Sequence, residues 1–114
     1  MSQTRVVVQL QQGTNHMDSV KMVATPPQDT IYWIQVAMMV RTLHARTCGL
    51  FGKTDQAPYK RAVDAICRKL ETAMKTRFQA TGGNQFRETF SGAHAGKRAT
   101  YRIDIEIAGP VYTT

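Results

Sequence analysis

The sequence lacks most of the features by which small proteins are assigned to an oxidising compartment or a membrane. Its two cysteines, Cys48 and Cys67, are too few for the disulfide framework of a small secreted domain. Residues 1–5 are mostly polar and do not resemble a signal peptide. The longest apolar stretch, residues 31–40, is interrupted by Gln35 and is about half as long as the ~20 residues that a membrane span requires. We therefore expect a cytoplasmic protein that does not associate with membranes.

The spacing of the cysteines and histidines does not match a standard metal site. A tetrahedral zinc site would have to combine residues from distant parts of the chain, namely His44, Cys48, Cys67 and one of His16 or His94. None of these spacings is that of a standard pair of zinc ligands. Cys67 also lies in an apolar stripe, where cysteine acts as a small hydrophobic residue. We expect no bound metal.

No recognisable catalytic motif is present either. Cys48 lies in a glycine-bearing loop and could act as a nucleophile, but a loop cysteine more often has no chemical task. Asp104 and Glu106, with Glu88 across a hairpin, are the only carboxylates that could gather around a catalytic metal. Residues that alternate along an amphipathic strand are usually its solvent face, where Arg87 can pair with them. These patterns favour a non-catalytic protein without a cofactor.

Acidic residues are scarce, and the resulting positive charge is concentrated in one part of the chain. The chain has 15 Lys and Arg residues against 8 Asp and Glu residues, a net charge of +7. Between residues 60 and 102 there are ten basic and three acidic residues, so this segment accounts for the whole excess. Clustered cations on a folded domain attract polyanions through a long-range field.

The composition otherwise indicates one globular α+β domain over residues 1–114. At this length a chain buries roughly 65% of the surface that it exposes when unfolded. Alternating apolar residues predict two strands at residues 5–11 and 19–25, with Val6, Val8 and Leu10 on the buried side and a connection longer than two residues. The same alternation predicts a second hairpin from residues 85–90 and 98–107, joined by a mobile connection of small residues at 91–97.

Two helices are expected between the hairpins. The first, residues 31–46, would be capped by Asp29 or Thr30 and is apolar around most of its circumference. The second would be capped by Thr54 or Asp55 and end at the glycines of residues 81–84. The predicted order is therefore ββααββ, with an antiparallel sheet packed on two helices. Because the first helix has more apolar surface than so small a domain needs to bury, we also expect a homodimer or larger assembly.

The second helix has one apolar and one basic face. Its apolar residues recur every three or four positions, with Leu70 near the centre. On the opposite face, Asp64 and Glu71 have i,i+4 partners in Arg68 and Lys75. The other cations have no predicted partner on the helix.

This basic face and the base of the second hairpin form the candidate site. We expect non-catalytic binding of nucleic acid or another polyanion through phosphate contacts. The residues proposed to bind are Lys60, Arg61, Arg68, Lys69, Lys75, Arg77, Lys97 and Arg98. Tyr32, Tyr59 and Tyr101 are the only candidates for aromatic rings on which bases could stack. The alternative is a small protein-interaction module, such as an inhibitor, adaptor or assembly subunit, that docks its basic face on an acidic protein.

Overall fold

The computed structural model describes residues 3–76, 79–80 and 84–113 and has the predicted ββααββ order. The strands of the first hairpin are β1 (Thr4–Gln12) and β2 (Asn15–Ala24), and those of the second are β4 (Asn84–His94) and β5 (Lys97–Ala108). Between them lie α1 (Trp33–Thr47), the short 3-10 helix η1 (Cys48–Leu50) and α2 (Lys53–Thr76). Two further strands, β3 (Gln79–Ala80) and β6 (Val111–Tyr112), pair as a small second sheet that the sequence analysis did not predict.

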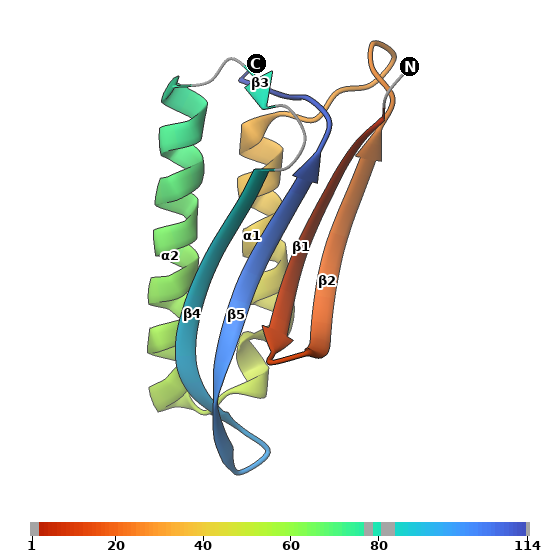
Figure 1. Ribbon diagram of the computed structural model, residues 1–114. Coiled ribbons are helices and arrows are strands. Elements are labelled where there is room, and N and C mark those ends of the chain that lie inside the picture. Colours follow the sequence, from red (N-terminus) through yellow and green to blue (C-terminus); the bar gives the residue numbers. More distant parts are fainter. Residues whose placement is uncertain (1–2, 77–78, 81–83, 114) are drawn as a thin grey trace.

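The four long strands form one antiparallel sheet in the order β2-β1-β5-β4. Both helices lie on the same face of this sheet, and the opposite face is left open (Figure 1). α1 packs over β1 and β2, and α2 packs over β4. The predicted class, an antiparallel sheet packed on two helices, is therefore confirmed.

The centre of the sheet is an apolar ladder between β1 and β5. Val6, Val8 and Leu10 pair with Ile107, Ile105 and Ile103, and all six side chains are buried. They face the helices, as the alternation of β1 predicts. β-branched side chains suit this pleated, fully covered position.

An aromatic cluster fills the space between η1, α2 and the second hairpin. Tyr59 of α2 stacks on Phe90 of β4 with ring centroids 4.6 Å apart, and Phe51 meets Tyr101 edge to face. The Tyr59 hydroxyl forms a 2.6 Å hydrogen bond with Thr47 Oγ1. Burial raises the pKa of Tyr59 to about 12. Edge-to-face and offset-stacked rings add packing energy beyond their buried area.

The helices begin at different residues from those predicted. At α1 the Gln35 Oε1 atom accepts a hydrogen bond of 2.7 Å from the Tyr32 N–H, so the cap predicted at Asp29 or Thr30 is wrong. Asp29 instead exchanges hydrogen bonds with Thr25 across the turn between β2 and α1. α2 begins at Lys53, where the Gly52 carbonyl accepts from the N–H groups one turn later. The cap predicted at Thr54 or Asp55 is therefore wrong, because both residues lie inside the first turn of α2.

Both hairpin connections are tighter than predicted. β1 and β2 are joined by two residues, Gly13 and Thr14, with Gly13 at a φ of 60°. The connection predicted at residues 91–97 is mostly strand, because β4 continues to His94 and β5 begins at Lys97. Ala95 and Gly96 form the turn with φ values of 54° and 79°, the pair of positive angles that a type I′ hairpin turn requires.

α1 is not buried all around. Trp33, Val36, Met39, Val40 and Leu43 face the core, whereas Ile34 and Met38 are each 60% exposed. The helix therefore has a conventional buried side and an apolar outer side. Among the described helices, none combines the length and apolar character needed to cross a bilayer.

Replacing Leu70 tests the packing of α2 on the sheet. Leu70 is 1% exposed at the centre of the apolar stripe. We expect Leu70→Ala to lower the free energy of unfolding by about 2–5 kcal/mol, because it removes buried methyl groups and leaves a cavity. Chemical denaturation followed by circular dichroism measures this change. An unchanged unfolding midpoint would contradict the packing described here.

Candidate polyanion-binding surface

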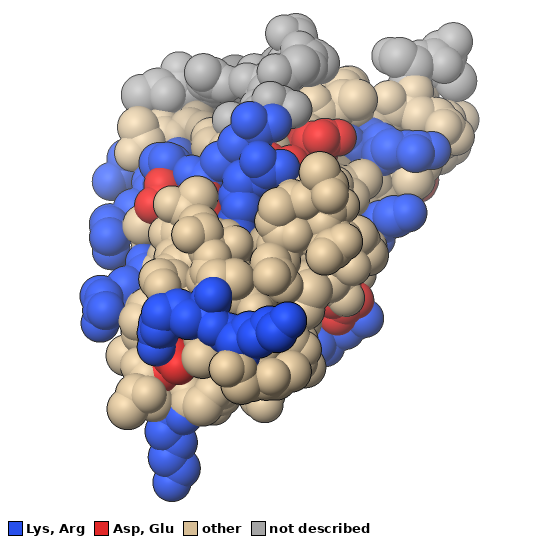
Figure 2. Space-filling model, turned by 60° about the horizontal axis from the view of Figure 1, so that its bottom comes forward, with Lys and Arg blue, Asp and Glu red and all other residues tan. Residues whose placement is uncertain are grey.

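The outer face of α2 has a straight row of three cations. Arg61, Arg68 and Lys75 are exposed and follow one another at intervals of seven residues. Two helical turns separate neighbours, so their Cα atoms are about 10.5 Å apart along the axis and the row is about 21 Å long. Within the described residues none of the three forms an ion pair. These three residues are called the α2 row below. Figure 2 shows blue side chains gathered along the side of the molecule where α2 runs.

Two other predicted cations of α2 are held by carboxylates. Lys60 Nζ lies 2.9 Å from Asp64 Oδ1, so Asp64 pairs with the residue four positions before it and not with Arg68 as predicted. Lys69 pairs with Glu88 and donates a hydrogen bond of 2.9 Å to the Arg87 carbonyl, both on β4. Lys69 therefore attaches α2 to the sheet edge.

The electrostatics around Asp64 add a cation from α1 to this surface. The hydrogen bond from Lys60 lowers the pKa of Asp64, and the charges of Lys60, Arg41 and Arg68 lower it further. Because its folded pKa is lowered, the ionised Asp64 stabilises the fold at neutral pH and loses this effect as the pH falls through that value. Arg41 is exposed. It was not among the predicted binding residues, because α1 was interpreted as an apolar helix.

The two cations of the second hairpin have different environments. Arg98 Nη2 lies 3.0 Å from Asp55 Oδ1 in the first turn of α2, and Arg98 Nη1 donates to Ser91 Oγ at 3.3 Å. His94 Nδ1 lies 3.0 Å from the Leu50 carbonyl oxygen, which accepts its hydrogen bond. The hairpin is thus attached to η1 and to α2, whereas Lys97 at the turn is exposed and has no ion pair in the described chain.

One predicted binding residue and the three predicted stacking rings need separate mention. Arg77 lies outside the described residues. Tyr59 and Tyr101 are 0% and 1% exposed in the aromatic cluster, so the prediction that they offer stacking surfaces is wrong. Tyr32 is half-buried and forms a bridge with Tyr112.

The residues considered for catalysis do not gather into one site. Asp104 is 2% exposed on the open face of the sheet, and Arg87 Nε donates to it at 2.9 Å, as the cross-strand pattern predicts. Glu88 points to the opposite face, where Lys69 holds it. Cys48, the candidate nucleophile, is half-buried at the start of η1, with its Sγ atom 4.0 Å from the Ala45 carbonyl oxygen. Burial raises the pKa of the thiol of Cys67, which was considered only as a metal ligand. In the ranges that the structure describes, no three His, Cys, Asp or Glu residues could hold a metal ion together.

The chain was compared with protein-family models, with curated proteins and with solved structures, and no match was found in any of the three comparisons.

Neutralising Arg98 and Lys97 separately should show which of the two hairpin cations stabilises the fold. In Arg98→Gln, Asp55 is left at 8% exposure without its cation, so we expect the free energy of unfolding to fall by about 1–2 kcal/mol. Lys97→Gln removes the same charge from an exposed residue and should change stability by less than about 0.5 kcal/mol. Thermal melts of the two variants check this. Equal losses in both would show that Arg98 does not hold the hairpin.

Proposed function

We propose that this protein binds nucleic acid or a similar polyanion through the outer face of α2, without catalysis. The α2 row carries the proposal: Arg61, Arg68 and Lys75 are exposed, aligned and free of ion pairs in the described chain. Arg41 beside Asp64 widens the surface toward α1. The two unpaired cysteines are compatible with action in the cytoplasm.

The form of the surface suits contact with a phosphate backbone. A helix holds its cations in fixed positions, and a row about 21 Å long can meet several phosphates of one strand. Such contacts position a nucleic acid without reading its bases. We therefore propose binding that depends strongly on salt and weakly on sequence.

The ion pairs of the fold suggest different roles for two groups of candidate residues. Arg61, Arg68, Lys75 and Lys97 are available to phosphates, while Lys69 and Arg98 are engaged with carboxylates of the fold. Lys60 is intermediate, since a phosphate could replace Asp64 as its partner. The free cations should dominate the binding energy.

A salt titration of the α2 row tests the proposal. We expect Arg61→Gln/Arg68→Gln to weaken binding of unrelated fluorescent oligonucleotides and to make the slope of log affinity against log salt shallower by about two units, one for each lost phosphate contact. Fluorescence anisotropy at several salt concentrations measures both quantities.

The matched control removes the same charge elsewhere. Arg5→Gln/Lys21→Gln neutralises two exposed cations on the open face of the sheet, on β1 and β2. We expect its salt slope to stay within experimental error of the parent. If the parent shows no binding at low salt, nucleic acid is not the ligand. If both double variants lose the same amount of oligonucleotide affinity, the α2 row is not the site.

A gain of affinity is expected where an ion pair is removed. Asp64→Asn releases Lys60 and removes a negative charge beside Arg68, so oligonucleotide binding should strengthen at low salt and the salt slope should steepen by about one unit. The control is Glu106→Gln, the same change of charge on the opposite, open face of the sheet. Equal gains in both variants would indicate a general charge effect without a defined surface.

A second candidate function is docking on an acidic protein. The observation in its favour is Leu50 of η1, which is 40% exposed and lies beside the hairpin that carries Lys97. An exposed apolar residue with neighbouring cations suits a protein interface, where apolar anchors are surrounded by charge. Such a partner would bind with defined stoichiometry and would not be displaced by random DNA or RNA.

A further inference from the structure

We propose that the polyanion bound by α2 is a double-stranded nucleic acid, held by its phosphates while its bases stay paired and stacked. This proposal rests on the proposed function and narrows the ligand from polyanions in general to one class. Three features of the molecule support it. The aromatic rings of the basic elements are covered, a pocket lies on the far side of the molecule and is uncharged, and the α2 row stands on the outside of a helix.

Among the described residues, α2 and the second hairpin offer bases no exposed aromatic ring. Tyr59, Phe90 and Tyr101 are 0%, 7% and 1% exposed, and Phe86 is half-buried. The ring of His94 is also half-buried, and its Nδ1 atom is hydrogen-bonded to a carbonyl oxygen of η1. Proteins that bind single strands gain much of their affinity from bases that stack on aromatic side chains. The described part of this surface has no such contribution to make.

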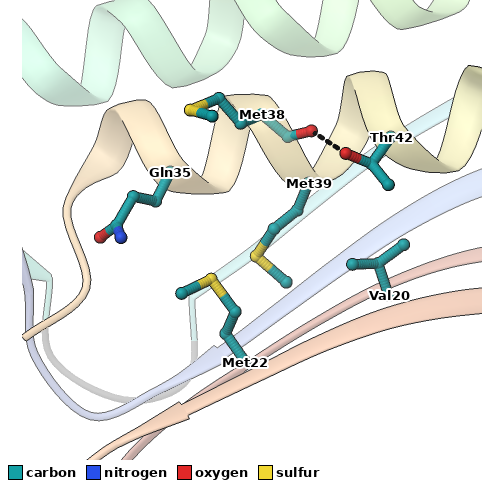
Figure 3. A pocket seen from close by; sticks show the side chains of 6 residues that line it. All are labelled: Val20, Met22, Gln35, Met38, Met39 and Thr42. Atoms are coloured by element: carbon teal, nitrogen blue, oxygen red, sulfur yellow. Dashed lines mark hydrogen bonds between the residues drawn. The ribbon is translucent and has the colours of Figure 1, made fainter.

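A pocket that could receive a base lies away from the cations. It has a volume of ≈ 260 Å³ and is lined by Val20 and Met22 of β2 and by Gln35, Met38, Met39 and Thr42 of α1. Met22 and Met39 point toward one another from the two elements (Figure 3). None of the lining residues is charged, and α2 lies over β4, at the opposite edge of the sheet from β2 (Figure 1). The helix α1 therefore separates this pocket from the α2 row.

The α2 row stands on the outside of a helix, where it can contact phosphates but cannot enclose bases. Arg61, Arg68 and Lys75 are exposed on the side of α2 opposite the buried Leu70. Single strands are typically bound in a positively charged groove that follows the backbone. In a duplex the phosphates lie outside and the bases pair with one another inside. A surface that offers only cations is therefore sufficient for a duplex.

The density of charge also favours a duplex. A duplex carries one negative charge per ≈ 1.7 Å of its axis, twice the density of one of its strands. The α2 row is about 21 Å long, so it runs beside about 12 phosphate charges of a duplex and about six of one strand. Each contact also releases more counterions from a duplex, about 0.9 against about 0.7 from a single strand.

The spacing of the α2 row suits the two backbones of a duplex. Neighbouring cations have Cα atoms about 10.5 Å apart, and the minor groove of B-form DNA is about 6 Å wide. The side chains of Arg61 and Arg68 are long, so they can contact phosphates on both sides of such a groove. A duplex is stiff over this length, whereas a single strand loses conformational freedom when its phosphates are held in line.

Two carboxylates limit the approach of phosphates from one side of the row. Asp64 and Glu71 are also seven residues apart and lie on the side of α2 that faces α1. Asp64 is balanced by its ion pair with Lys60 and by the charge of Arg41. Glu71 is exposed and forms no ion pair within the described chain. The duplex should therefore lie across the α2 row toward β4.

The first test compares ligands that carry similar numbers of phosphates. In fluorescence anisotropy at about 0.1 M NaCl, the parent should bind a 12-base-pair duplex at least about tenfold more tightly than an unstructured 24-nucleotide single strand. DNA and RNA duplexes are both measured, because they share the phosphate chemistry and the comparison identifies the source. Arg61→Gln/Arg68→Gln should reduce the preference to less than about threefold, whereas the control Arg5→Gln/Lys21→Gln should keep it.

The second test supplies the ring that the described surface lacks. Thr72 is exposed on α2 between Arg68 and Lys75. Thr72→Tyr should strengthen single-strand binding at least about fivefold, because a base can stack on the new ring, and should leave duplex binding within about twofold of the parent. The control is Gln28→Tyr, which adds the same ring to an exposed residue between β2 and α1 and should change neither affinity. Circular dichroism verifies that each variant keeps the fold.

The outcomes separate the duplex from the proposed function. If neither ligand binds at low salt, nucleic acid is not the ligand and both proposals fail. If the single strand binds as tightly as the duplexes, polyanion binding stands and the proposal of a duplex is wrong. A preference that persists in Arg61→Gln/Arg68→Gln would mean that the duplex binds elsewhere on the molecule. Thr72→Tyr without a gain in single-strand binding would show that the missing ring does not cause the preference.

Discussion

The pairing of β1 with β5 joins two hairpins that come from opposite ends of the chain. Each hairpin alone would be a two-stranded ribbon, which is marginally stable in water. Joined in the middle, they present a continuous apolar face on which α1 and α2 can pack, at the β2 side and the β4 side respectively. The position of α2 over one edge, and hence of the α2 row, follows from this arrangement.

Alternation and helical periodicity were sufficient to predict the architecture, because the buried residues of β1, β5 and α2 are repeated at the spacing of their elements. The errors lie where tertiary contacts decide the local structure. Residues 91–97 are small and glycine-rich and resemble a loop, but pairing with β5 extends the strand to His94. For α1 the sequence predicted more apolar surface than the domain needs to bury, and Ile34 and Met38 are indeed exposed on the side that the sheet and α2 leave uncovered.

For the candidate site, the sequence located the excess positive charge. It could not show which cations form ion pairs within the fold and which remain available to a partner. The pairs Arg98–Asp55 and Lys69–Glu88 connect residues that are far apart in sequence, so no spacing along one helix reveals them. These ion pairs engage Arg98 and Lys69 in attaching the hairpin and α2 to the fold, whereas the α2 row has no ion pair among the described residues. Surface ion pairs contribute little to stability, but here they determine which charges remain available to a partner.

Trp33 gives the protein an internal reporter. It is the only tryptophan of the chain, is fully buried, and meets Phe86 of β4 edge to face at 6.0 Å. Its indole Nε1 has no hydrogen-bond partner among the described residues, so its surroundings are apolar. Its fluorescence should therefore be blue-shifted in the folded chain and should shift to the red when α1 separates from the sheet. Because Trp33 lies in the core, this optical signal can follow folding in charge variants without any label on the basic surface.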